Sequence, residues 1–373
     1  MKVLILGGSH RDIPLIETLK KKGFFVITLA NANYYIGHKF ANKYYNIDFN
    51  DLKSVKEIIK KEKIDYLIAG CGEESFYNTA LLANEFSLGN YDEMEAVEII
   101  HNKWKFKEFC LKNSISVPKG SDSYKGLEFP IIIKPQNLSG GKGVNVVYDE
   151  KELKTSINFA KKFSNNLVFE EFIDGEIIAY SAILKNQKVV YDFVAKDIPY
   201  LNPYLISTAH SYEIDKNIKN DIKNDTEKIA KILQLKNGPF HAQILLKDNK
   251  YYFMDVTRRI AGDLFPYLIE YADNVNYSEM VVNSYMGMDF EVNKGDKKYA
   301  VRHCVMPKKN GIYEGIECKV DYKLRLDLVK KNELIKDYTK VHTGIFILVF
   351  NKYDEMLNTA RKINDLIYAK VKD

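Results

Sequence analysis

The sequence lacks several features that would place it in a common class at once. Its four cysteines, Cys71, Cys110, Cys304 and Cys318, are far apart and form no Cys-x-x-Cys pair. Free thiols in a reducing compartment are therefore expected, and a zinc site is not. No apolar run approaches the roughly 18 residues of a membrane helix, and the opening run, Val3–Leu6, is too short for a signal peptide. We therefore expect a cytoplasmic protein with no membrane partner.

An excess of one charge is also missing. The 373 residues include 55 Lys and Arg and 50 Asp and Glu, a net charge of +5 that is spread without a basic block. Such a balance gives little support to a nucleic-acid partner. The composition, 46% hydrophobic and 28% charged, is that of a globular protein and provides enough chain for two or three packed lobes.

The first hundred residues alternate short apolar strands with helical segments. The expected strands are Val3–Leu6, Phe24–Leu29 and Tyr66–Ala69, and the expected helices are Ile13–Lys22, Leu52–Lys61, Phe76–Glu85 and Glu93–Ile100. Strands that are apolar on both faces indicate a parallel sheet covered on both sides. Residues 1–100 are thus predicted to form a Rossmann-like α/β lobe, although Gly7-Gly8-Ser9-His10 does not match a dinucleotide fingerprint.

The pattern changes after Val117-Pro118, where β-segments and hairpins dominate. The expected strands are Pro130–Pro135, Val144–Tyr148, Leu167–Phe172, Ile177–Leu184, Val189–Phe193, Phe240–Leu246, Tyr251–Val256, Tyr299–Val305 and Gly344–Phe350. Turn residues at Asn186-Gln187 and Asp248-Asn249 predict two hairpins. We expect an α+β domain over residues 101–290, with a small lid subdomain at about 120–175. A C-terminal α+β lobe over 291–373 is expected to end in a helix at Tyr353–Tyr368.

A strand that ends in lysine and a glycine-rich loop form the most informative stretch. Lys134 closes an apolar strand, and Ser139-Gly140-Gly141-Lys142-Gly143 follows. A lysine there requires a charge partner, and glycines let backbone amides approach an anion. Together they suit a polyphosphate. The loop is not a Walker A motif, because Gly143 follows Lys142; a flexible hairpin tip is the alternative interpretation.

Acidic residues gather at the end of the strand Leu167–Phe172. Glu170, Glu171 and Glu176 lie within seven residues of one another, and carboxylates are rarely buried there without partners. The amine of adenine and the hydroxyls of ribose are suitable donors to them. A charged edge strand that discourages aggregation is the alternative interpretation.

A third group lies on the second predicted hairpin. Pairing of its strands would bring Gln243 and Asp255 close together, and their oxygens suit Mg²⁺. Arg258 and Arg259 follow, and an arginine can neutralise a phosphoryl group during transfer. A cross-strand polar pair with surface arginines is the alternative interpretation.

These groups occur along the chain in an order that resembles the ATP-grasp superfamily. The resemblance extends from Lys2 to about Phe290. The resemblance implies that ATP, with Mg²⁺ or alternatively Mn²⁺, lies between two α+β subdomains beneath the glycine-rich loop. The nucleotide-binding positions that it implies are Lys103, Lys134, Ser139, Gly140, Gly141, Gly143, Glu170, Glu171, Ile173 and Glu176. It implies Gln243 and Asp255 as metal ligands, and Lys134 and Arg259 as catalytic residues that contact the transferred phosphoryl group.

The sequence departs from the family pattern at the metal positions. Gln243 is neutral where an acidic residue is usual, although carbamoyl-phosphate synthase also has a glutamine at this position. Asp255 replaces the usual glutamate and Thr257 the usual asparagine. Whether one or two ions bind is left open. The stretch from Arg259 to Asp263 is similar to the Arg-x-x-Gly-Asp pattern of amino-acid-ligase-like members, which implies that Gly262 and Arg258 lie near the carboxylate substrate.

The resemblance implies an ATP-dependent ligase that phosphorylates a carboxylate and joins it to an amine, both small molecules. Two alternatives stay open: a carboxylase or kinase-like enzyme of the same superfamily, and a non-catalytic ATP-binding regulatory protein. His210, in the loop-like stretch Tyr200–Tyr212, is a candidate substrate contact, with a surface histidine as the alternative. Arg302 is a further candidate anion contact. A homodimer is expected only because C2 dimers are the commonest oligomers.

Overall fold

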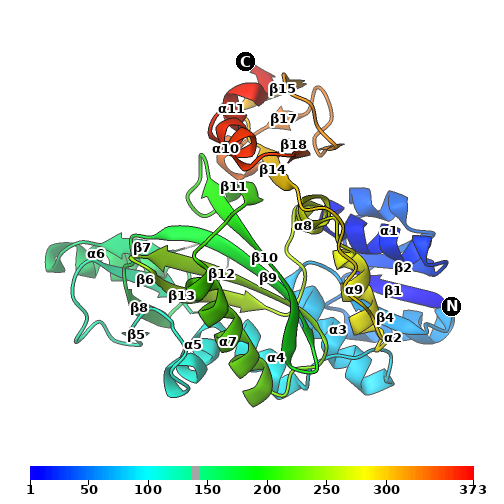
Figure 1. The fold of residues 1–373 in the computed structure, drawn as a ribbon, viewed down its shortest axis with the longest axis horizontal. Helices are drawn as coiled ribbons and strands as arrows, with labels where there is room; N and C mark the ends of the chain where they lie inside the picture. Colours follow the sequence, from blue (N-terminus) through cyan, green and yellow to red (C-terminus); the bar gives the residue numbers. More distant parts are fainter. Residues whose placement is uncertain (137–142) are drawn as a thin grey trace.

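A computed structural model describes residues 1–136 and 143–373. The described chain forms four β-sheets. Figure 1 shows the N-terminal lobe in blue at the right, a small subdomain around α6 at the left, and the C-terminal strands and helices at the top. The predicted combination of α/β and α+β architecture is confirmed.

The N-terminal sheet is parallel throughout, as predicted, and has the strand order β3-β2-β1-β4. Its strands are β1 (Lys2–Leu6), β2 (Phe25–Ala30), β3 (Lys43–Asn46) and β4 (Tyr66–Ala69). The helices of the lobe are α1 (Ile13–Lys21), α2 (Leu52–Glu62) and α3 (Glu73–Phe86). Strand β3 was not predicted, because it is an exposed edge strand with no apolar alternation.

The small subdomain is an antiparallel sheet in the order β5-β8-β6-β7, packed on one helix. Its elements are β5 (Gly120–Ser121), β6 (Ile131–Pro135), β7 (Asn145–Val147), α6 (Glu150–Lys161) and β8 (Leu167–Glu171). Ile131, Ile133, Leu153 and Phe169 form the core of this subdomain. The core holds β6 and β8 together, so their ends lie at one edge.

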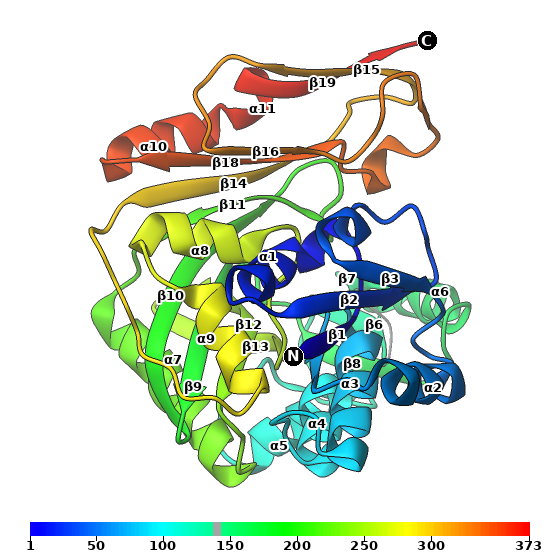
Figure 2. The same cartoon turned by 90° about the vertical axis from the view of Figure 1, so that its right-hand side faces the viewer.

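The large sheet contains eight strands in the order β13-β12-β9-β10-β11-β14-β18-β16. They are β9 (Glu176–Lys185), β10 (Lys188–Pro199), β11 (Ile206–Ser211), β12 (Gly238–Lys247), β13 (Lys250–Thr257), β14 (Tyr299–Val305), β16 (Leu324–Asp327) and β18 (Gly344–Phe350). Figure 2 shows β14, β18 and β16 side by side beyond β11. The sheet therefore continues across the domain boundary that we expected near residue 290.

Both predicted hairpins are confirmed, at β9–β10 and β12–β13. The turn residues Asn186 and Gln187 have φ of 52° and 61°, and Asp248 and Asn249 have φ of 49° and 58°. Left-handed pairs of this kind match the right-handed twist of the strands that they join. The second hairpin is the element that carries Gln243 and Asp255.

Two predictions for irregular and terminal segments were wrong. Ile206–Ser211, expected within a loop, is strand β11, because it pairs with β10 and β14. The expected helix at Tyr353–Tyr368 divides into α10 (Tyr353–Arg361) and α11 (Ile363–Leu366), and the chain then enters β19 (Ile367–Lys372). Strand β19 joins β15 (Gly311–Cys318) and β17 (Leu334–Ile335) in a three-stranded sheet. Long-range pairing overrides local helical periodicity there.

Helices connect the N-terminal lobe to the large sheet. Helices α8 (Phe265–Asp273) and α9 (Tyr277–Tyr285) lie between the two sheets (Figure 1) and share one apolar core with β1, α1 and β9. Helices α4 (Met94–His101), α5 (Lys103–Lys112) and α7 (Lys216–Ile232) cover the other side of the large sheet. No helix within the described residues combines the length and the apolarity that a membrane crossing requires.

Candidate active site

A cavity of about 220 Å³ lies between the small subdomain and the β12–β13 hairpin. Its walls are largely apolar and include Phe106, Val117, Ile132, Val168, Ile177, Phe253 and Met254. Its polar side chains are Lys103, Lys107, Lys134, Gln136, Glu170, Gln243 and Asp255. Apolar walls beside a group of lysines suit a ligand with an aromatic base at one end and an anionic tail at the other.

Two lysines meet at Glu170 inside this cavity. Lys134 Nζ is 2.6 Å from Glu170 Oε2, and Lys107 Nζ is 2.7 Å from Glu170 Oε1. Burial alone would raise the pKa of Glu170, but the two ammonium groups outweigh burial and hold that pKa at about 2. Burial lowers the pKa of Lys107 in spite of its carboxylate partner. An anionic ligand can therefore compete with Glu170 for two cations that are already in place.

The start of helix α5 positions two of the three lysines. The Asn102 side chain accepts hydrogen bonds from Trp104 N at 3.1 Å and Lys105 N at 3.0 Å and so caps the helix. Lys103 and Lys107 are four residues apart, on one face of the helix. Lys103 Nζ lies 3.2 Å from Asp255 Oδ2.

The β12–β13 pairing brings the two expected metal ligands together. Gln243 is the direct cross-strand partner of Asp255, and both side chains line the cavity. The register shifts between Gln243 and Ile244, because Met254, the residue directly before Asp255, has no cross-strand partner. Such a bulge is a feature common beside active sites. One carboxylate and one amide oxygen on a single sheet face suit Mg²⁺, which completes its shell with water and phosphate oxygens.

A second cavity, of about 680 Å³, adjoins the first and shares Lys103, Gln136 and Asp255 with it. Arg259 lines this cavity and donates from Nε to Glu73 Oε1 at 2.9 Å. Burial would raise the pKa of Glu73, but hydrogen bonding to His101 and the charge of Arg259 hold it at about 2. The N-terminal lobe, through Glu73, thus fixes the arginine expected to act in catalysis.

A third cavity, of about 780 Å³, lies at the carboxyl ends of the N-terminal strands. The turn after β1 offers backbone amides there, but Asp12 Oδ2 accepts from Gly8 N at 2.8 Å and from Ser9 N at 2.9 Å. Asp12 Oδ1 also accepts from Cys71 N at 2.8 Å. A carboxylate of the chain itself occupies the position where a Rossmann dinucleotide site would hold a phosphate.

Several predicted nucleotide contacts lie outside the first cavity. Glu171 Oε1 accepts from Lys119 N at 2.7 Å, and Ile173 is half-buried beyond β8. Glu176 is bonded to Lys196 and to the Tyr212 hydroxyl, which lower its pKa. Gly143, a further predicted contact, adopts a left-handed backbone conformation with φ of 74°. Ser139, Gly140 and Gly141 lie outside the described residues.

The expected substrate contacts separate into different surroundings. Arg258 is buried and donates from Nε to Asp92 Oδ2 at 2.7 Å and from Nη2 to Lys236 O at 2.7 Å, so its guanidinium is used inside the protein and does not line the described cavities. His210 is neither on the surface nor in a loop: it lies on β11, is 3% exposed, and burial lowers its pKa. Gly262 packs near the Arg11 side chain, and Arg302 is buried on β14 beside Cys304.

Sequence reasoning missed Lys107, Gln136 and Glu73. The four-residue spacing of Lys103 and Lys107 could have identified Lys107, because residues at this spacing lie on one face of a helix. Glu73 could not be found in this way, because it is 186 residues from its partner Arg259.

Comparison with known proteins agrees with this geometry. Residues 127–266, which contain β6 to β13, match the family model described as the ATP-grasp domain. This part of the chain is therefore similar to an ATP-grasp domain. The chain is 24% identical over 295 residues to the carbamoyl phosphate synthase large chain of Clostridium beijerinckii, covering 72% of the chain but 27% of that protein.

Two other similarities extend over almost the whole chain. It is 21% identical to the formate-dependent phosphoribosylglycinamide formyltransferase of Saccharolobus solfataricus, covering 99% of the chain and 97% of that protein. The L-amino acid ligase of Bacillus licheniformis superposes with a TM-score of 0.84 at 17% identity, covering 100% and 98% of the two chains. The chain spans only 27% to 38% of the synthase large chains that it matches first.

Proposed function

We propose that this protein is an ATP-dependent ligase that phosphorylates a small carboxylate and joins it to a small amine. The observation that carries the proposal is the pair of adjoining cavities. The first contains three lysines, Gln243 and Asp255, and the second contains Arg259. Adjoining cavities would hold the nucleotide and the acceptor substrates close together, which favours transfer between them.

The side chains of the first cavity fit ATP and a magnesium ion. The apolar walls suit the adenine ring, and Lys103, Lys107 and Lys134 suit the phosphates. Gln243 and Asp255 would hold Mg²⁺, which supplies charge neutralisation between neighbouring phosphate oxygens when it is bound. Because Glu170 already holds Lys107 and Lys134, its carboxylate sets the positions from which they meet the phosphate tail.

The reaction then proceeds in two balanced steps. A carboxylate oxygen of the first substrate attacks the γ-phosphorus, the bond between the γ-phosphorus and the bridging oxygen breaks, and ADP leaves. The amine nitrogen next attacks the acyl carbon, the carbon–oxygen bond to phosphate breaks, phosphate leaves, and the amine proton passes to solvent. Lys134 and Arg259 stabilise the charge on the transferred group, and no covalent link to the protein is required.

The second cavity is a suitable place for the amine. Glu73, Glu74 and Glu98 line it. Glu73 is engaged by Arg259, and Glu98 Oε2 accepts from Lys105 Nζ at 2.6 Å. Among the residues that the structure describes, Glu74 receives one long hydrogen bond, of 3.4 Å, from Asn50 Nδ2. Its carboxylate is therefore the member of this group with the most capacity to accept from an ammonium group.

The test is release of ADP and phosphate from Mg²⁺-ATP with a matrix of amino acids, other small acids and amines. Each reaction is run with the wild type and with Lys134→Met, which removes one of the three lysine cations of the cavity and reports any contaminating ATPase. Stoichiometric release of ADP and phosphate that requires one acid and one amine, together with a condensed product by mass spectrometry, is the expected result. Release of ADP with a single substrate, without free phosphate and without a condensed product, would overturn the ligase assignment in favour of a kinase.

A further inference from the structure

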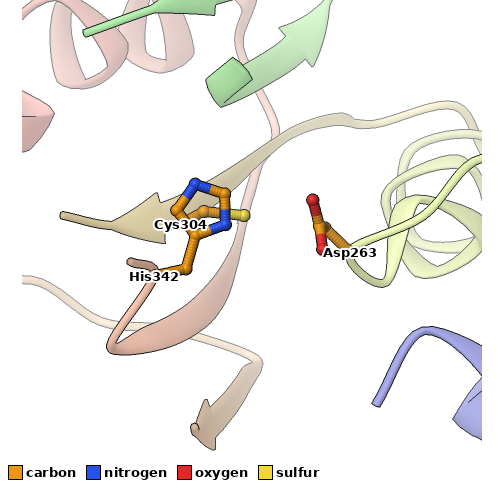
Figure 3. A group of neighbouring side chains, drawn as sticks. All are labelled: Asp263, Cys304 and His342. Atoms are coloured by element: carbon orange, nitrogen blue, oxygen red, sulfur yellow. The ribbon is translucent and has the colours of Figure 1, made fainter. Parts of the chain in front are cut away.

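A sulfur, a nitrogen and an oxygen donor meet outside the proposed nucleotide cavity. Cys304 lies on β14, His342 in the segment before β18, and Asp263 in the turn before α8. Figure 3 shows the three side chains pointing toward one another. One ligand atom from each lies within 4.8 Å of the others, and no second group of three such residues occurs in the part of the chain that the structure describes.

The donor set is specific in its chemistry. Thiolate, imidazole and carboxylate together suit borderline divalent transition metals such as Zn²⁺, whereas Mg²⁺ requires oxygen ligands. The spacing of the cysteines gave no sign of this group, because one cysteine is joined by ligands 41 residues before it and 38 residues after it.

The environment of the group leaves a donor available. His342 Nε2 is buried and has no hydrogen-bond partner among the described residues. Buried polar atoms without a partner are rare and require an explanation such as an ion or a water. Cys304 is fully buried, so its sulfur can react with little other than what enters this space.

Two arginines and a histidine lie around the group. Arg302 Nη1 lies 3.2 Å from Cys304 Sγ and 3.8 Å from Asp263 Oδ2. Arg11 Nε and His10 Nε2 lie 3.2 Å and 3.0 Å from Asp263 Oδ1. Arg302 can donate to a metal-bound thiolate, which stabilises that form. The two arginines repel a dication, so we expect weaker binding than at a four-cysteine site.

We propose that Asp263, Cys304 and His342 bind one divalent transition-metal ion of the zinc class. On binding, the S–H bond of Cys304 breaks, a sulfur–metal bond forms, and the proton passes to solvent. Three protein ligands leave a coordination position free, and Asp263 and His342 both line the third cavity together with His10. The ion would connect the turn before α8 to the C-terminal strands, and the proposal does not depend on the ligase activity.

The experiment uses the full chain, made metal-free by chelation and then dialysed against Co²⁺ or Zn²⁺. We expect one ion per chain by elemental analysis, and for Co²⁺ a sulfur-to-metal charge-transfer band in the near ultraviolet. Cys304→Ser should abolish the band, and His342→Gln should weaken binding by at least about tenfold. Cys110→Ser, at another fully buried cysteine, is the matched control and should retain both signals.

The outcomes separate clearly. If Cys304→Ser does not fold, as judged by circular dichroism, the wild-type band and the His342→Gln titration still decide. A wild type without the thiolate band, or equal metal content in the wild type and His342→Gln, would overturn the proposal. Mg²⁺ in large excess should leave the band unchanged, and loss of the band under Mg²⁺ would overturn the zinc-class assignment.

Discussion

At the scale of single residues, Glu170 organises the proposed nucleotide cavity. It was predicted as an adenine contact, but in the structure its two oxygens face Lys107 and Lys134 at 2.7 and 2.6 Å. A buried carboxylate between two ammonium groups is stable only while all three charges are present. The arrangement therefore makes stability depend on pH as well as on ligand.

The pH dependence has a defined sign. The pKa of Glu170 is lowered from 4.5 to about 2 on folding, so its stabilisation is complete above pH 4.5 and is lost as the pH falls toward 2. The change corresponds to roughly 3 kcal/mol of unfolding free energy. We expect Glu170→Gln to reduce the loss of stability between pH 4.5 and 2, measured by urea unfolding at each pH.

The control for this prediction is Glu128→Gln, at an exposed glutamate of the same small subdomain. It should keep the wild-type dependence on pH. An identical acid dependence for the wild type and Glu170→Gln would show that Glu170 is not the group that titrates.

Sequence reasoning succeeded at residues whose position alone was informative. Lys134 ends an apolar strand, and a charge there requires a partner. Lys107 was missed because lysines on helices are usually solvated, and Arg258 was misplaced because a buried partner, Asp92, lies 166 residues away. The sequence identified which charged residues were unusual, but not which groups neutralise them.

At the scale of elements, the turn that enters β7 depends on glycine. Gly143 has φ of 74°, and a Cβ there would lie 2.7 Å from Pro135 Cγ and 2.8 Å from Phe163 Cδ2. Gly23 has φ of 81°, but a Cβ there would meet nothing within 4 Å. Both glycines adopt a left-handed backbone conformation, but only at Gly143 do other atoms lie close to the position that a Cβ would occupy.

This difference gives a matched pair of variants. Gly23→Ala should cost only the left-handed backbone penalty, about 1 kcal/mol. Gly143→Ala should cost more, by about 1–3 kcal/mol for the steric contact. Urea unfolding of both variants measures the difference, and equal losses of stability would contradict the geometry of this turn.

Local turn chemistry explains which elements were predictable. The β9–β10 and β12–β13 hairpins were found because Asn and Asp residues between apolar runs favour left-handed turns. Strands β11 and β19 were not found, because they are defined by partners far away in the sequence. In β11 the apolar and polar residues do not alternate, and the short alternation in β19, at residues 369–372, follows directly on a helical pattern.

At the scale of the whole molecule, one buried ion pair joins the N-terminal lobe to the large sheet. Asp92 lies between α3 and α4, and Arg258 follows β13; their side chains are 2% and 3% exposed and 2.7 Å apart. Lys236 N also donates to Asp92 Oδ1 at 2.7 Å. The pair fixes the lobe that carries Glu73 against the hairpin that leads to Arg259.

Removal of one partner should therefore be costly. Asp92→Ala leaves the Arg258 charge buried and should lower the free energy of unfolding by about 3–5 kcal/mol. The matched control is Glu93→Ala, because Glu93 is the neighbouring residue and its pair with Lys236 is exposed, at 3.7 Å. That variant should change stability by less than about 1 kcal/mol. Similar losses in the two variants, measured by urea unfolding, would contradict the role of the buried pair.

The whole-molecule arrangement was predictable only in part. The parallel N-terminal sheet, the two hairpins and the order of the charged motifs are visible in the sequence. The addition of β14, β18 and β16 to the same sheet as β9 to β13 is not, because pairing over about 90 residues has no local pattern.

The central claim is that ATP binds in the cavity between the small subdomain and the β12–β13 hairpin. The most direct measurement is the equilibrium binding of Mg²⁺-ATP by calorimetry, which needs no knowledge of the other substrates. We predict one site per chain in the wild type and in Lys154→Met, at an exposed lysine on α6. In Lys134→Met the affinity should fall by about tenfold or more, because one charge-assisted contact to phosphate is lost. Absence of binding to the wild type, or equal affinity in Lys134→Met and Lys154→Met, would contradict the account.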